Sequence, residues 1–325
     1  DMETGKYTLP DGLPELRALV AARHQAEHGV EIDADRNVMI SAGNMQALNT
    51  LFHTMLDPGD EIILTDPCFS SHIQQINLFS GIPVYWPLDE ENNWSLDVEL
   101  LPGLISDKTQ AIVLVSPSNP TGVIFSKTQL IRVAEIARQH NILLIIDDPY
   151  SDFIYESENK NKYFNLASVE EFKEHVVYLY SFSKSYAMSG WRLNYMVMPE
   201  ELKQEALKVH DATLICAPRI SQLAGITALS EPSDHKQEFA SILNRRRKLI
   251  IERLDKVDHV FSSQDPEGAY YVFPKILTAH ADSQSFAIEL LNNAKVAVTP
   301  GSAFGPSGEH HVRMAYCVDD EAINL

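Results

Sequence analysis

The sequence predicts an α/β fold, with a large domain built on a doubly wound, mostly parallel sheet and a smaller α+β domain at the C-terminal end. Short apolar runs alternate with amphipathic stretches between residues 37 and 214. Several runs are apolar at every position, as in Ile142–Ile146, where a half-exposed strand would alternate with polar residues. Such runs are typical of strands buried on both faces, in parallel sheets that helices cover on each side.

The elements of the large domain follow from these patterns. Six strands are expected, at Asn37–Ser41, Glu61–Thr65, Ala111–Ser116, Ile142–Asp147, His175–Ser181 and Leu193–Met198. Amphipathic stretches predict helices at Met45–Leu56, Ser126–His140 and Glu201–Leu214. An earlier helix is predicted over Leu13–His28, because Pro14 stands near its first turn and Gly29 follows its end.

The small domain is predicted from a different order of elements. A long helical pattern over Ser233–Asp258 precedes strand-like segments at Tyr270–Phe273 and Val296–Thr299, with a helix at Ser283–Asn293 between them. We expect the domain boundary inside the long helix, near Arg247. The chain then divides into an N-terminal segment over residues 1–12, a large domain over 13–246 and a small domain over 247–325.

Composition narrows the possible partners. The 325 residues carry a net charge of −19, which argues against nucleic acid and anionic membranes. The basic run Arg245–Lys248 lies in a helical pattern and is interpreted as a solvated helix face. Three widely spaced cysteines, Cys68, Cys216 and Cys317, predict neither a disulfide scaffold nor a zinc site and favour a reducing, cytoplasmic location. No signal peptide or membrane span is recognised, and we expect both ends of the sequence to be incomplete.

The segment Ser181-Phe182-Ser183-Lys184, followed eight residues later by Arg192, carries the most specific chemical signal. An apolar, strand-like run delivers two hydroxyls and a lysine to its end. A lysine in this setting can form a Schiff base with an aldehyde, and Ser181 and Arg192 can hold a phosphate nearby. A single lysine is more often a solvated loop residue, but this combination predicts a pyridoxal-phosphate (PLP) site.

Other strand ends carry residues that suit the same cofactor, and ligands of open α/β sheets bind at the carboxyl ends of strands. A carboxylate such as Asp147 can keep the pyridine nitrogen protonated. Asp148 competes for this role, although strand alternation should turn it to the opposite side. Tyr150 and Asn119 can each reach the ring hydroxyl.

Other residues could contact the phosphate and the face of the cofactor ring. Gly43 ends a strand-like run, and the backbone N–H groups of Asn44 and Met45 open the following helix, where an anion can bind. Phe69 offers a flat face to the ring, although it is equally well explained as a core residue. Each strand end alone is explained by an ordinary turn, whereas their convergence at one edge is not.

Five motifs, taken together, identify a family resemblance. They are Ser-Pro-Ser-Asn-Pro-Thr-Gly at 116–122, Asp-Asp-Pro-Tyr at 147–150, Ser-Phe-Ser-Lys at 181–184 with Gly-Trp-Arg at 190–192, Pro-Gly-Ser-Ala-Phe-Gly at 300–305, and Val-Arg-Met at 312–314. With these motifs in this order, nearly the whole chain resembles the class I/II aminotransferases, the fold-type I PLP enzymes.

The resemblance implies roles for individual residues. Lys184 would be the Schiff-base lysine and the base that moves the proton, and Arg313 would bind the substrate α-carboxylate. Tyr7 would reach the phosphate of the neighbouring subunit, which implies a homodimer with shared active sites. The remaining roles are cofactor contacts: Asp147 at the pyridine nitrogen, Asn119 and Tyr150 at the ring oxygen, Ser181 and Arg192 at the phosphate, and Phe69 on the ring.

We therefore expect a PLP-dependent aminotransferase that moves an amino group from an L-amino acid to a 2-oxo acid by a ping-pong mechanism. Met45 stands where some bacterial aspartate aminotransferases of this branch have a lysine, which favours neutral or aromatic donors. Two alternatives remain open, because a fold does not fix a function. One is a PLP-dependent lyase or synthase on the same fold, and the other is the PLP-binding effector domain of a transcription regulator.

Other conspicuous residues receive structural interpretations. His72 and His210 have no partners at ligand spacing, so no metal site is expected. His310 and His311 are expected at the surface. Cys68 is expected to be a small buried residue and not a nucleophile.

Overall fold

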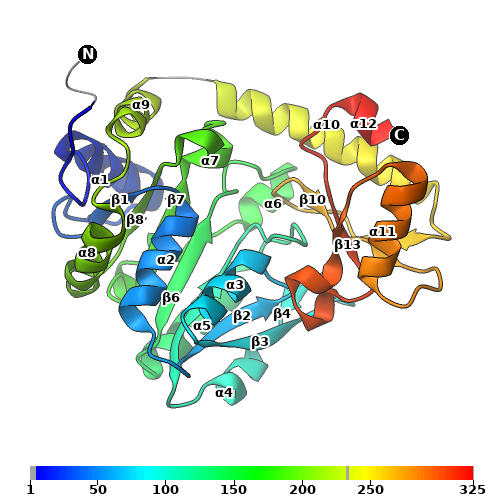
Figure 1. Ribbon diagram of the computed structural model, residues 1–325, viewed down its shortest axis with the longest axis horizontal. Coiled ribbons are helices and arrows are strands. Elements are labelled where there is room, and N and C mark those ends of the chain that lie inside the picture. Colours follow the sequence, from blue (N-terminus) through cyan, green and yellow to red (C-terminus); the bar gives the residue numbers. More distant parts are fainter. Residues whose placement is uncertain (1–4, 232–233, 325) are drawn as a thin grey trace.

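The computed structural model describes residues 5–231 and 234–324, and its centre is an eight-stranded sheet with the order β1-β8-β7-β6-β5-β2-β3-β4 (Figure 1). Neighbours from β7 through β6, β5 and β2 to β3 are parallel, whereas β8 runs antiparallel to both β7 and β1. The strands are β1 (Val38–Ser41), β2 (Glu61–Asp66), β3 (Ile82–Asp89), β4 (Ser95–Leu96), β5 (Thr109–Leu114), β6 (Leu143–Asp148), β7 (Val176–Ser181) and β8 (Asn194–Val197).

Helices cover both faces of this sheet because alternate strand residues enter two separate cores. Leu144 of β6 packs in the core that receives α1 and α5, whereas Ile145 packs in the core that receives α2, α3 and α8. This arrangement confirms the doubly wound α/β fold. The helices of this part are α1 (Pro14–His28), α2 (Asn44–Met55), α3 (Ser70–Leu78), α4 (Leu101–Leu104), α5 (Lys127–Gln139), α6 (Ser157–Lys162), α7 (Phe182–Ser185), α8 (Glu200–Leu214) and α9 (Arg219–Ser230).

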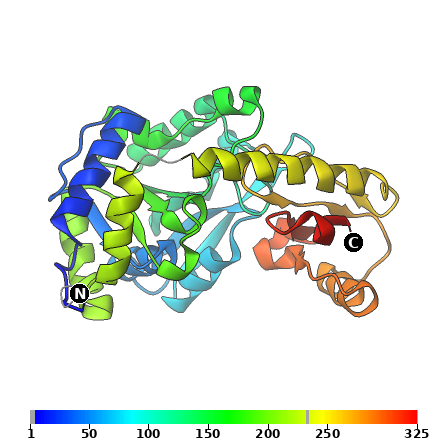
Figure 2. The same cartoon turned by 90° about the horizontal axis from the view of Figure 1, so that it is seen from above.

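The smaller part lies at one end of the molecule, and α10 (His235–Asp255) runs from the large sheet towards it (Figures 1 and 2). It contains a β10-β13-β12 sheet and a β11-β9 pair. The strands of these sheets are β9 (Phe261–Ser262), β10 (Tyr271–Val272), β11 (Lys275–Ile276), β12 (Thr299–Pro300) and β13 (Val312–Ala315), and the helices beside them are α11 (Ser283–Ala294) and α12 (Asp320–Asn324). The division of the chain at residue 247 stays a prediction, since α10 is continuous there.

Two expectations about the second half of the chain are wrong. The strand expected at Val296–Thr299 begins only at Thr299, where β12 pairs with β13. Arg247 does not lie on a solvated face: it is 7% exposed, and its Nε donates to the carbonyl of Pro266 at 2.6 Å. Helical periodicity explains the burial, because Arg247 shares the inward side of α10 with Leu243 and Ile250.

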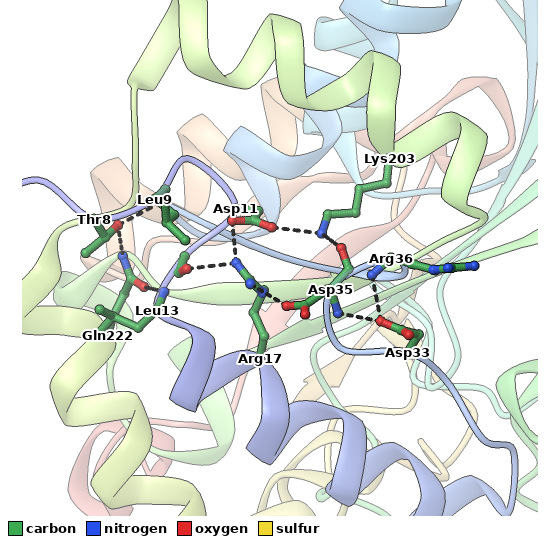
Figure 3. Close-up of polar contacts among 11 residues, drawn as sticks. Thr8, Leu9, Asp11, Leu13, Arg17, Asp33, Asp35, Arg36, Lys203 and Gln222 are labelled. Atoms are coloured by element: carbon green, nitrogen blue, oxygen red, sulfur yellow. Dashed lines mark hydrogen bonds and ion pairs between the residues drawn. The ribbon is translucent and has the colours of Figure 1, made fainter.

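A buried group of charges fastens the N-terminal segment to the large part (Figure 3). Asp11 forms ion pairs with Arg17 of α1 and with Lys203 of α8, the latter at 2.9 Å. Lys203 Nζ also donates to the carbonyl of Asp35 at 2.6 Å. Gln222 of α9 accepts from the Leu13 N–H at 2.7 Å. These contacts fix the chain directly after Tyr7.

No helix within residues 5–231 and 234–324 is long and apolar enough to cross a membrane.

Candidate active site

A pocket of about 260 Å³ lies where β6 and β7 end and α2 begins, and it collects most of the predicted site residues. Larger hollows exist elsewhere on the surface, including one of about 940 Å³ at the opposite ends of β7 and β8, but strand-end motif residues do not line that one. Ten predicted residues line the pocket: Asn44, Met45, Phe69, Asn119, Asp147, Tyr150, Ser181, Lys184, Arg192 and Arg313.

Lys184 reaches the pocket from α7, a single helical turn directly after β7. Ser181 caps this turn by accepting from the N–H of Ser183 at 3.2 Å, which fixes where the lysine leaves the backbone. Burial lowers the pKa of Lys184, and the nearby positive charges of Arg192 and Arg313 act in the same direction. A neutral amine is the form that attacks a carbonyl or takes a proton.

Only the first carboxylate of the Asp147–Asp148 pair lines the pocket. Asp147 accepts a hydrogen bond from Asn44 Nδ2 at 2.6 Å, and its other oxygen lies 3.0 Å from His72 Nε2. Asp148 points to the opposite face, as strand alternation requires, and accepts from the Tyr178 hydroxyl at 3.0 Å. Burial raises the pKa of Asp148 to about 6, and the Tyr178 hydrogen bond opposes this shift.

A chain of polar contacts joins the large sheet to the small one. Asn119 Nδ2 lies 3.5 Å from the Tyr150 hydroxyl, which lies 2.9 Å from the hydroxyl of Tyr271 in β10. Arg313 of β13 donates from Nη1 to Asn119 Oδ1 at 2.9 Å, and its guanidinium carbon lies 4.5 Å from the centre of the Tyr271 ring. Burial raises the pKa of Tyr150 far above its usual range, so this phenol keeps its proton.

The start of α2 and Arg192 form a close-fitting corner of the site. Arg192 donates from Nη2 to the carbonyl of Ala42 at 3.3 Å, which brings the guanidinium against Gly43. A Cβ at Gly43 would stand 2.3 Å from that nitrogen, and the φ of +88° also favours glycine. The free N–H groups at the start of α2 and the guanidinium together suit an anion.

These residues fit PLP. The pocket offers an amine, a carboxylate and a phenol to the ring, and a helix N-terminus with an arginine to the phosphate. Two buried polar atoms, Asn44 Oδ1 and Arg313 Nε, have no hydrogen-bond partner among the described residues, which leaves them available to a ligand.

The sequence interpretation missed His72 and misplaced His311. His72 is 1% exposed and stands beside Asp147; it follows Phe69 by three residues at the start of α3, and that helical spacing was the available signal. His311 is not at the surface: it is 2% exposed and stacks on Phe273 with ring centres 4.9 Å apart. Tyr271 was also missed, and no local pattern marks it.

The structure also places three other residues that the sequence analysis discussed. Cys68 is buried, as expected, and burial raises the pKa of its thiol far above the usual range, which disfavours the reactive thiolate. His210 is buried beside the Ser41 hydroxyl at 3.2 Å. Tyr7 does not line the pocket of its own chain and is 76% exposed.

Comparison with known proteins identifies the family. The family model for aminotransferase class I and II matches residues 1–324. The chain is 36% identical over 319 residues to an aspartate aminotransferase of Pyrococcus horikoshii, a match covering 98% of this chain and 80% of that protein. It is 31% identical over 319 residues to aromatic-amino-acid aminotransferase 2 of Thermococcus litoralis, covering 98% of this chain and 81% of the relative.

Solved structures with a similar fold are also aminotransferases. The aromatic aminotransferase of Pyrococcus horikoshii superimposes with a TM-score of 0.94 at 32% identity, over 100% of this chain and 86% of that one. The aspartate aminotransferase of Thermus thermophilus with maleate gives 0.91 at 30% identity, over 99% and 82%. The chain therefore belongs to the class I and II aminotransferase family, and it is a PLP-dependent transferase.

Proposed function

We propose that this protein transfers the amino group of a neutral or aromatic L-amino acid to a 2-oxo acid by a ping-pong mechanism. The observation that carries the proposal is one pocket in which Lys184, Asp147 and Arg313 meet. Bound PLP supplies an aldehyde that condenses with amines and a ring that withdraws electrons. The protein's part is to hold that ring, to orient the donor and to move a proton.

The pocket would hold the cofactor through contacts at each end. Asp147, fixed by Asn44 and His72, would face the pyridine nitrogen. Tyr150 and Asn119 would contact the ring oxygen. Four groups remain for the face of the ring and the phosphate, namely Phe69, Ser181, Arg192 and the N–H groups of Asn44 and Met45. The Gly43 N–H already donates to Asn194 Oδ1 at 3.1 Å.

Lys184 and Arg313 would act on the donor. The guanidinium of Arg313 would take the α-carboxylate in its two-pronged fork, the geometry that arginine favours for carboxylates. That grip would turn the α-carbon towards Lys184, whose Nζ would remove the α-proton. The lowered pKa of Lys184 supports this role, because a base must be unprotonated before it can accept a proton.

Lys184→Ala tests the site. We expect the variant to lose turnover and the visible absorption band of the holoenzyme, because the amine that meets the aldehyde is gone. Lys208→Ala removes an exposed lysine of α8 and serves as the control. A Lys184→Ala protein with wild-type turnover would overturn the assignment. Parallel double-reciprocal plots with varied donor and acceptor would support the ping-pong order, and intersecting plots would contradict it.

The preference for a neutral or aromatic donor is supported by Met45. Met45 lines the pocket, and its thioether has no charge with which to meet a second carboxylate. The named relatives include both aspartate and aromatic enzymes, so they do not decide the question. Measuring kcat/KM for a panel of donors with 2-oxoglutarate tests the preference, and it fails if aspartate is the best donor.

We propose further that two copies form a homodimer in which Tyr7 reaches the partner's phosphate site. Exposed apolar side chains surround α9, namely Tyr7, Leu9, Trp191 and Ile220. Gln222 of α9 donates to Thr8, and Ser221 donates to the carbonyl of Trp191, so these side chains belong to one region. A monomeric mass by light scattering, or unchanged cofactor affinity in Tyr7→Phe, would contradict the proposal.

A further inference from the structure

Tyr271 connects two residues to which the proposed function gives separate tasks. It is 6% exposed and lies in β10 of the small sheet, yet its hydroxyl lies 2.9 Å from that of Tyr150, which follows β6 of the large sheet. Its ring lies under the guanidinium of Arg313. In the register of β10 and β13, Tyr271 stands opposite Ala315, so Arg313 is its diagonal neighbour on the same face.

The hydroxyl contact has a preferred direction. A phenol has one proton to donate, and the Asn119 amide nitrogen beside Tyr150 only donates. If Tyr150 gives its proton to the cofactor's ring oxygen, the Tyr271 hydroxyl must donate to the Tyr150 oxygen. Successive hydrogen bonds polarise one another, so donation by Tyr271 makes Tyr150 a stronger donor.

The ring contact acts on a different group. The guanidinium of Arg313 lies 4.5 Å from the centre of the Tyr271 ring and 4.9 Å from that of Phe304. A cation over aromatic faces is attracted by them and loses rotational freedom. Arg313 therefore presents its fork in one orientation before a carboxylate arrives.

We propose that Tyr271 is a positioning residue with two separable functions: its hydroxyl strengthens the hydrogen bond that Tyr150 donates to the cofactor ring, and its ring orients Arg313 for the donor carboxylate. The proposal rests on the proposed function of this site. Tyr271 thereby links the cofactor-binding and donor-binding parts of the site, because its hydroxyl contacts Tyr150 and its ring contacts Arg313.

Tyr271→Phe tests the first function, because it removes the hydroxyl and keeps the ring. A weaker hydrogen bond from Tyr150 stabilises negative charge on the ring oxygen less, so the bound chromophore holds its proton more tightly. We expect the pH midpoint of the holoenzyme's visible band to rise by roughly 0.1–0.7 unit, as a charge-assisted bond loses about 10–30% of its strength. The KM for the amino donor should stay within about twofold.

Tyr271→Leu tests the second function, because it removes the ring as well. The KM for the donor should then rise by about two- to thirtyfold, the equivalent of a lost cation–aromatic contact. Tyr316→Phe is the matched control. It deletes another buried hydroxyl of the same aromatic cluster, one that donates to the carbonyl of Ala269 at 3.3 Å, and it should leave the midpoint and the KM unchanged.

The double variant Tyr150→Phe/Tyr271→Phe decides whether the hydroxyl acts through Tyr150. Its midpoint should equal that of Tyr150→Phe alone, because the intermediary is already gone. The proposal is overturned if Tyr271→Phe leaves the midpoint unchanged, or if its shift persists without the Tyr150 hydroxyl. A wild-type protein that shows no visible band with PLP would instead refute the proposed function.

Discussion

His72 offers the sharpest test of how the large sheet supports Asp147. Both side chains are almost fully buried, and His72 Nε2 lies 3.0 Å from Asp147 Oδ2. An ionised carboxylate only accepts hydrogen bonds, so Nε2 must carry the proton in this contact. His72→Leu keeps much of the volume and removes the donor, which leaves Asp147 with Asn44 as its side-chain hydrogen-bond partner among the residues that the structure describes.

The size of the effect follows from the kind of bond that is lost. A hydrogen bond to a charged group contributes about 1.5–3 kcal/mol. If that energy aims Asp147 at the pyridine nitrogen, its loss should weaken cofactor binding by roughly 10- to 150-fold. The rate should fall as well, because a displaced carboxylate supports a protonated ring less well. His72→Gln should recover part of the affinity, since its amide can still donate.

Two measurements separate this role from a general loss of packing. The Kd for PLP comes from titrating the apoenzyme, and kcat comes from steady-state turnover with excess cofactor. His53→Leu changes an exposed histidine of α2 and is the control. Urea titrations of the apoenzymes should report similar stability for His72→Leu and His72→Gln. Wild-type Kd and kcat in His72→Leu would refute the reasoning.

Two further predictions concern backbone fit and pH. Gly43→Ala should raise the Kd for PLP at least about tenfold, because the new Cβ would stand 2.3 Å from Arg192. The control is Gly59→Ala, which has a similar φ but open space around it and should leave the Kd for PLP unchanged. Burial raises the pKa of Asp148 to about 6, above its value of about 3.9 in the unfolded chain, so the folded protein binds this proton more tightly. Relative to Asp148→Asn, the wild type should lose about 2–3 kcal/mol of unfolding free energy as the pH rises from about 4 to about 6, measured by urea titration. A difference between the two proteins that does not change with pH would contradict this prediction.

The sequence determined most of the central sheet, because a strand buried on both faces has a short run of residues that are apolar at every position. Each of the six strands expected in the large sheet is present, and the strands that end in polar motifs deliver them to one edge, since neighbouring parallel strands point the same way. β3 was not predicted, because it has no such apolar run. Its sequence contains Pro83 and Pro87 and is partly exposed, and it lies near the edge of the sheet, so neither composition nor periodicity marked it.

The sequence also determined most of the candidate site, because strand alternation alone turns Asp147 towards the pocket and Asp148 away from it. Only the tertiary structure decided which side chains support these groups. Tyr271 meets Tyr150 across 121 residues of chain, and His72 meets Asp147 across 75. Contacts of this range depend on how two sheets and a helix pack together, and no periodicity within either segment records that packing.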